Sequence, residues 1–119
     1  MYLRIPSLFF IGLLVLYVSV LTSCSSKTEA HTVEIKLPTL QCSSCSKIVT
    51  RALKSVKGVK EAKVNLGEKS ARVIYFPDQT NIFEMTQAVS LAGYNANETQ
   101  ADSKAYSGLP DCCKISSAK

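Results

Sequence analysis

Two cysteines, Cys42 and Cys45, stand at the junction between two kinds of hydrophobic pattern. Before them, apolar and polar residues alternate over residues 31–37, which predicts a half-buried strand. After them, apolar residues recur at helical spacing up to residue 56, which predicts an amphipathic helix. The pair therefore lies where a loop enters a helix, and unpaired N–H groups and the helix dipole stabilise thiolates there. A thiolate binds soft metal ions or attacks disulfides, so these are the two candidate functions.

The same periodicities continue along the chain. The first helix is expected to begin near Ser46, with Ser43 or Ser44 as its cap, and to end before Gly58. Asn81 followed by Glu84 resembles a capping box and predicts the start of a second helix. Three further strands are expected at residues 59–66, 71–76 and 94–99, the last of them polar and suited to a sheet edge.

The predicted order is strand, helix, strand, strand, helix, strand. With short crossovers and right-handed βαβ units, this order gives a four-stranded antiparallel sheet with both helices on one face. We therefore predict an α+β, ferredoxin-like βαββαβ sandwich over residues 31–99.

The N-terminal segment has the features of an export signal. Arg4 precedes an apolar run at residues 8–21, which is shorter than the ~20 residues that a membrane-spanning helix needs. Leu21-Thr22-Ser23-Cys24 then resembles a bacterial lipobox. That resemblance implies a lipoprotein signal peptide at residues 1–23, a lipid on Cys24 and a tether at residues 24–30. The expected location is the periplasmic side or cell surface, held to the membrane by the lipid; an uncleaved anchor and a soluble secreted product are the alternatives.

Charge and motifs exclude other classes of function. The chain has 14 Lys and Arg against 9 Asp and Glu, a net charge of +5, and the basic residues form no block. This distribution is typical of a solvated surface, and we expect no nucleic-acid partner. No catalytic triad, paired carboxylates or phosphate-binding loop was found, so we expect a binding protein that is not an enzyme.

Several short motifs resemble the heavy-metal-associated domain, a family that includes copper chaperones, a periplasmic mercury-scavenging protein and modules of metal-pumping P-type ATPases. The motifs are Leu40-Gln41-Cys42-Ser43-Ser44-Cys45, Ala52-Leu53, Gly58-Val59, Ala62-Lys63-Val64, Ala71-Arg72-Val73 and Gly93-Tyr94. The resemblance implies that Cys42 and Cys45 are the metal ligands and that Tyr94 lies beside the metal loop. It places Leu40 where the family usually has a buried Met, a conservative exchange. It also implies transfer of the metal to a transporter or acceptor protein that bears cysteines.

The chemistry of two thiolates agrees with this resemblance. Near-linear two-coordination by sulfur suits Cu(I) and Hg(II), which are soft cations. Zn(II) is disfavoured, because it takes four tetrahedral ligands and the loop offers two.

A C-terminal tail, residues 100–119, continues beyond the resemblance and carries Cys112 and Cys113. Asp102 is expected to cap a short helical turn and Gly108 to close it. The fourth strand is expected to pair antiparallel with the first and so to end away from the metal loop, which means that the tail must come back. About a dozen residues can make this return, because they reach ~40 Å and a strand is ~17–20 Å long. We hypothesise that Cys112, Cys113 or both join Cys42 and Cys45 and retain the metal.

Two alternatives for the tail stay open: separate capture of soft metal by its thiols, or a structural disulfide to the body. For the whole chain, the alternative function is a membrane-tethered thiol–disulfide exchanger, because an exported protein lives where disulfides form.

Overall fold

The computed structural model describes residues 28–114. The predicted signal peptide, Cys24, most of the tether and the end of the tail lie outside these residues. Within the described part, no helix is both long and apolar enough to cross a membrane.

Three antiparallel strands form the sheet: β1 (His31–Lys36), β2 (Val59–Asn65) and β3 (Ser70–Tyr75). Their order is β1-β3-β2, with β3 in the centre. Val33 lies opposite Val73 in β3, and Val73 lies opposite Ala62 in β2. Because side chains alternate across a strand, these apolar residues share one face of the sheet.

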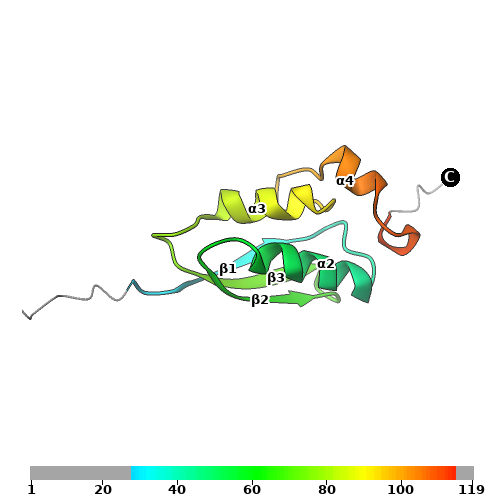
Figure 1. Ribbon diagram of the computed structural model, residues 1–119. Helices are drawn as coiled ribbons and strands as arrows, with labels where there is room; N and C mark the ends of the chain where they lie inside the picture. The colour runs from blue at the N-terminus through cyan, green and yellow to red at the C-terminus, as the bar shows by residue number, and fades with distance from the viewer. Residues whose placement is uncertain (1–27, 115–119) are drawn as a thin grey trace, which may run out of the picture.

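Helices α2 (Ser43–Lys54) and α3 (Ile82–Leu91) pack with the sheet around one core. Ile35, Val49, Leu53, Met85 and Val89 are fully buried, so strands and helices both contribute. The predicted cap of α3 is confirmed: the Glu84 N–H donates to Oδ1 of Asn81 at 3.0 Å. The apolar periodicities identified in the sequence thus produce the expected two layers (Figure 1).

The predicted fourth strand is wrong. Residues 94–95 have no regular structure, and residues 96–99 form a turn closed by an isolated bridge between Ala96 and Thr99. Asn97 has φ of +50° and bonds twice to the end of β1: its Oδ1 accepts from the Lys36 N–H and its N–H donates to the Lys36 carbonyl, both at 2.9 Å. An Asn in the left-handed region reverses the chain direction, so pairing with β1 stops after this contact. The sheet of the described residues therefore has three strands.

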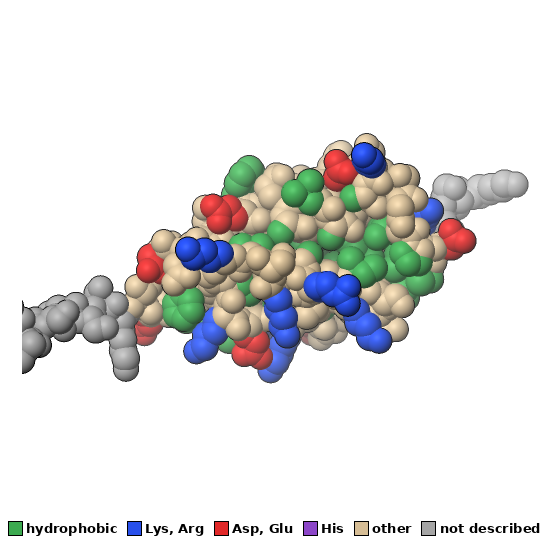
Figure 2. Space-filling view, in the orientation of Figure 1, with side chains coloured by type: hydrophobic (Ala, Val, Ile, Leu, Met, Phe, Trp, Pro, Cys, Tyr) green, Lys and Arg blue, Asp and Glu red, His purple; other side chains and the backbone are tan. Residues whose placement is uncertain are grey.

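Charged side chains are distributed over several elements. Lys47, Arg51 and Lys54 are exposed on α2, and Figure 2 shows basic side chains along this side of the molecule, with acidic ones among them. Two large apolar side chains on α3, Phe83 and Leu91, are each 67% exposed.

Candidate metal centre

Cys42 is the N-cap residue of α2. The helix begins at Ser43, earlier than predicted, and Cys42 rather than Ser43 or Ser44 precedes it with extended backbone angles. No side chain caps this end, so first-turn N–H groups remain available. The backbone N–H of Cys45 is the main cause that lowers the pKa of Cys42 to about 6, and the thiols of Cys112 and Cys45 lower it further. Cys42 is therefore mostly a thiolate at neutral pH.

Cys45 lies in the first turn of α2 and points inward. It is fully buried, and its Sγ is 3.2 Å from Sγ of Cys42. Leu40, also fully buried, belongs to the same apolar cluster. The CxxC spacing thus places one sulfur near the surface and the other in the core.

The tail turns back onto the body as soon as it leaves the turn at residues 96–99. The Ala101 N–H donates to Oδ1 of Asn95 at 2.8 Å, and the Asp102 N–H donates to the Ser90 carbonyl at 3.0 Å. The Asn95 N–H in turn donates to Oγ1 of Thr39, in the loop that leads to Cys42. The chain therefore never leaves this end of the sheet, and the long return expected from a fourth strand is not needed.

A short helix, α4 (Ser103–Ser107), follows. As predicted, Asp102 caps it, accepting from the Ala105 N–H at 2.8 Å, and Gly108 ends it. Gly93 makes the close approach of α4 possible: its φ is +99°, and a Cβ there would lie 3.0 Å from Cδ1 of Leu109 and 3.1 Å from the Ala105 carbonyl oxygen. Leu109 is only 8% exposed. These contacts fix the start of the next turn.

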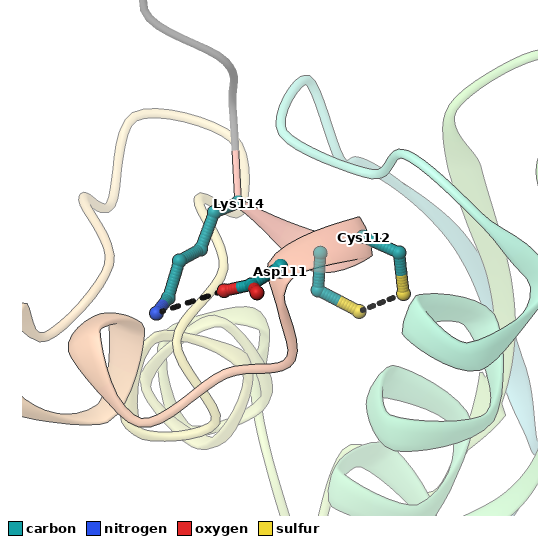
Figure 3. Close-up of polar contacts among 4 residues, drawn as sticks. Asp111, Cys112 and Lys114 are labelled. Atoms are coloured by element: carbon teal, nitrogen blue, oxygen red, sulfur yellow. Dashed lines mark hydrogen bonds and ion pairs between the residues drawn. The ribbon is translucent and has the colours of Figure 1, made fainter.

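That turn is the 3₁₀ helix η1 (Asp111–Cys113), which lies at the end of the molecule where α2 begins (Figure 1). It brings two more sulfurs to the CxxC pair. Sγ of Cys113 lies 2.6 Å from Sγ of Cys45 and 3.7 Å from Sγ of Cys42. Sγ of Cys112 lies 3.2 Å from Sγ of Cys42 and 3.8 Å from Sγ of Cys113. Figure 3 shows Cys112 with one of its sulfur–sulfur contacts, near the ion pair between Asp111 and Lys114, whose charged atoms are 3.8 Å apart.

The four thiols are free, and they differ in exposure. Cys112 is exposed and Cys42 is half-buried, whereas Cys45 and Cys113 are fully buried. Burial, followed by the neighbouring Cys45, raises the pKa of Cys113 to about 12. The side chain of Cys42 is the main cause that raises the pKa of Cys112. The cluster thus combines Cys42, whose pKa is lowered, with Cys112 and Cys113, whose pKa values are raised.

Tyr94 closes the inner side of the cluster. It is fully buried beside the sulfurs of Cys113 and Cys45, and burial strongly raises the pKa of its hydroxyl. The hydroxyl makes no hydrogen bond of ordinary geometry within the described residues. The hydroxyl is therefore neutral, and it can donate a hydrogen bond to the sulfur of Cys113 or Cys45 when that thiol loses its proton.

Sequence reasoning named all four thiols but missed what holds the tail. Asn95, Asn97 and Thr39 were not singled out, although Asn residues are common where a turn bonds to neighbouring backbone. The contact of Gly93 with α4 was also missed, because nothing in the local pattern indicates a partner so far along the chain.

Comparison with known families matches residues 34–95 to the heavy-metal-associated domain. The chain belongs to the heavy-metal-associated domain family. Cys42, Cys45 and Tyr94 lie within the matched residues, whereas Cys112 and Cys113 lie beyond them.

The names of two curated relatives of this heavy-metal-associated domain refer to mercury and to copper. The mercuric transport protein periplasmic component of Shewanella putrefaciens is 35% identical over 75 residues, covering 63% of this chain and 82% of that protein. A copper-exporting P-type ATPase of Staphylococcus epidermidis is 31% identical over 91 residues, 76% of this chain but 11% of the ATPase. The chain therefore spans only a small part of the ATPase.

Solved structures share the fold. Oxidized MerP from Ralstonia metallidurans CH34 is 29% identical, with a TM-score of 0.56 over 58% of this chain and 96% of that one. The CopZ metallochaperone is 26% identical, with a TM-score of 0.54 over 56% of this chain and 98% of that one. Each of these structures is thus almost completely covered by slightly more than half of this chain.

Proposed function

We propose that this protein captures a soft cation, Cu(I) or Hg(II), through Cys42 and Cys45 and retains it with Cys112 and Cys113. The observation that carries the proposal is the meeting of four free sulfurs, from two segments far apart in the sequence, through contacts of 2.6 to 3.8 Å. Soft cations prefer thiolate sulfur, and family membership supports copper or mercury as the cargo.

The sulfur separations favour more than two ligands. With a metal–sulfur bond of ~2.3 Å, two opposed thiolates stand ~4.6 Å apart and four tetrahedral ones ~3.8 Å apart. The pairs Cys42–Cys113 and Cys112–Cys113, at 3.7 and 3.8 Å, match the higher coordination. Additional ligands slow the loss of a cation, so the proposed role is sequestration or controlled transfer to a transporter or acceptor with its own cysteines.

The presence of four nearby sulfurs weakens the argument against Zn(II) as a ligand of this site. Zinc was disfavoured because the loop offers two ligands, but Cys112 and Cys113 bring the number within reach to four. Zn(II) therefore belongs in the titration beside Cu(I) and Hg(II). We further propose, from the sequence of residues 1–24, that the protein is exported and tethered by lipid at Cys24.

The experiment is a titration of the reduced full chain against a competing chelator, with free thiols counted at each step. A Cys24→Ser background leaves only the four described cysteines to react. We expect one tightly bound Cu(I) or Hg(II) per chain, with Cys42 and Cys45 protected from alkylation and the tail pair protected in the same step. Failure to bind either cation tightly would contradict the proposal.

Thiol–disulfide exchange is a second candidate, favoured by two observations. Cys42 has the lowered pKa of an attacking thiol, and Cys45 and Cys113 lie 2.6 Å apart, close enough to pair on oxidation. Repeated reduction of a disulfide substrate by the metal-free protein, with a dithiol as electron source, would support this function. Its absence together with tight metal binding would leave the metal role alone.

A further inference from the structure

Three of the four sulfurs form a nearly equilateral triangle. Sγ atoms of Cys42, Cys112 and Cys113 all lie within 4.8 Å of one another, and the three separations are 3.2, 3.7 and 3.8 Å. Cys45 stands behind this triangle, fully buried against Cys113. The outer three sulfurs therefore make a group distinct from the CxxC pair, sharing with it only Cys42.

Such a triangle has the shape that a trivalent, pyramidal centre requires. Trivalent arsenic forms three single bonds to sulfur and keeps a lone pair on the fourth side, so its three sulfurs lie on one side of it. With bonds of ~2.3 Å, such a pyramid places its sulfurs ~3.5 Å apart, closer than the ~4.0 Å of a flat triangle. The mean of the three observed separations is near this pyramidal value.

Two of the three sulfurs in the triangle are accessible, whereas that of Cys113 is fully buried. Cys112 is exposed and Cys42 is half-buried, so an uncharged solute can reach them without opening the core. Cys112 and Cys113 are adjacent in η1 and could supply two of the three bonds, and Cys42 stands at hydrogen-bond distance to supply the third. The lone pair of the centre can then face away from the three sulfurs, where no fourth ligand is needed.

We propose that Cys42, Cys112 and Cys113 form a three-thiolate site for trivalent arsenic, taken up as arsenous acid. The S–H protons of Cys112 and Cys113, and one proton taken from solvent because Cys42 is a thiolate, combine with the three hydroxyl groups; three arsenic–oxygen bonds break, three arsenic–sulfur bonds form and three waters leave. No electrons are transferred, so the arsenic stays trivalent and no oxidant is required. The inference extends the proposed function to a second class of ligand at the same cluster.

The test is an arsenite titration of the reduced full chain in the Cys24→Ser background. Near-ultraviolet charge-transfer absorbance and the mass of the intact protein report binding. One arsenic per chain is expected, with three sulfur neighbours by X-ray absorption. Cys112→Ser and Cys113→Ser should each weaken arsenite binding by at least about tenfold, because each removes one of three bonds. Ser44→Ala, at an exposed position of the same helix turn, is the matched control and should change it by less than about threefold, whereas Cys45→Ser should weaken it less than either tail variant.

Parallel titrations with Cu(I) and Hg(II) separate this inference from the proposed function. Binding of these cations without binding of arsenite would overturn the arsenic site alone. Binding of arsenite without either cation would overturn the proposed function alone. An equal loss of arsenite in Cys45→Ser and Cys112→Ser, with circular dichroism unchanged, or a count of two sulfurs, would overturn the three-thiolate assignment.

Discussion

The two cysteine pairs reach the same cluster by different physical routes. Cys42 and Cys45 are placed by local structure, since one is the N-cap of α2 and the other lies in its first turn. Cys112 and Cys113 sit on a single 3₁₀ turn, whose position depends on α4 and Leu109 packing against Gly93. The body pair therefore depends on the fold shared with the family, and the tail pair on a few contacts of this chain. Variants that remove one pair or the other can test this difference.

Removal of the body pair should have the largest effect. The double variant Cys42→Ser/Cys45→Ser is expected to weaken Cu(I) and Hg(II) binding by more than about a hundredfold, beyond the usual cost of losing a group that only supports a ligand. Chelator competition measures the change, and circular dichroism controls for folding. Retained affinity would mean that the tail pair is the principal site.

Removal of the tail pair should have a smaller effect. Cys112→Ser/Cys113→Ser is expected to weaken metal retention several-fold and to leave a two-coordinate ion at the body pair, because Cu(I) and Hg(II) accept two thiolates. X-ray absorption should count fewer sulfur neighbours than in the unchanged protein. An unchanged affinity and sulfur count would show that the tail takes no part.

A substitution that detaches the tail from the body should weaken metal retention as the loss of Cys112 and Cys113 does, although all the thiols remain. Gly93→Ala places a Cβ at positive φ and against Leu109 and Ala105, and should destabilise the docked tail by about 1–3 kcal/mol. Faster amide exchange in α4 and weaker metal retention are expected together. Gly108→Ala is the matched control: its Cβ would meet its nearest atom at 3.6 Å with no positive φ, so little change is expected. Equal effects of the two variants would contradict this role of Gly93.

The smallest effect is a difference in thiol reactivity. Cys42 has a pKa of about 6, so it is mainly thiolate at pH 7 and its alkylation should slow as the pH falls through 6. Cys112 is more exposed, but its pKa is raised, so its alkylation should rise only at alkaline pH. Mass spectrometry of the metal-free protein after brief iodoacetamide treatment would measure the order. Faster labelling of Cys112 at pH 7 would contradict it.

The sequence alone predicted most of the body. Alternation and helical spacing placed β1, β2, β3 and α3 close to their observed bounds, and the caps at Asn81 and Asp102 were predicted from residue type. These features depend on residues near one another in the chain, which is where sequence patterns carry information.

The sequence prediction failed where contacts between residues far apart in the chain determine the local structure. In residues 94–99 the alternation is real, since Tyr94 and Ala96 are both fully buried. Asn97 nevertheless turns the chain after one paired contact with Lys36. Similarly, the extended length of the tail was the only sequence argument that it could approach Cys42 and Cys45. The contact of α4 with Gly93, which holds the tail there, depends on packing between residues that no local pattern connects. That the tail thiols bind metal stays a prediction.

The docking of η1 beside α2 also has a kinetic consequence. Cys112 and Cys113 are held by the same chain, so they act at an effective concentration that short tethers place in the millimolar range. A bound cation that loses one sulfur would be recaptured before it diffuses away. On the proposed function, an acceptor protein would have to outcompete Cys112 and Cys113, so its thiols should set the residence time of the cation more strongly than dilution does.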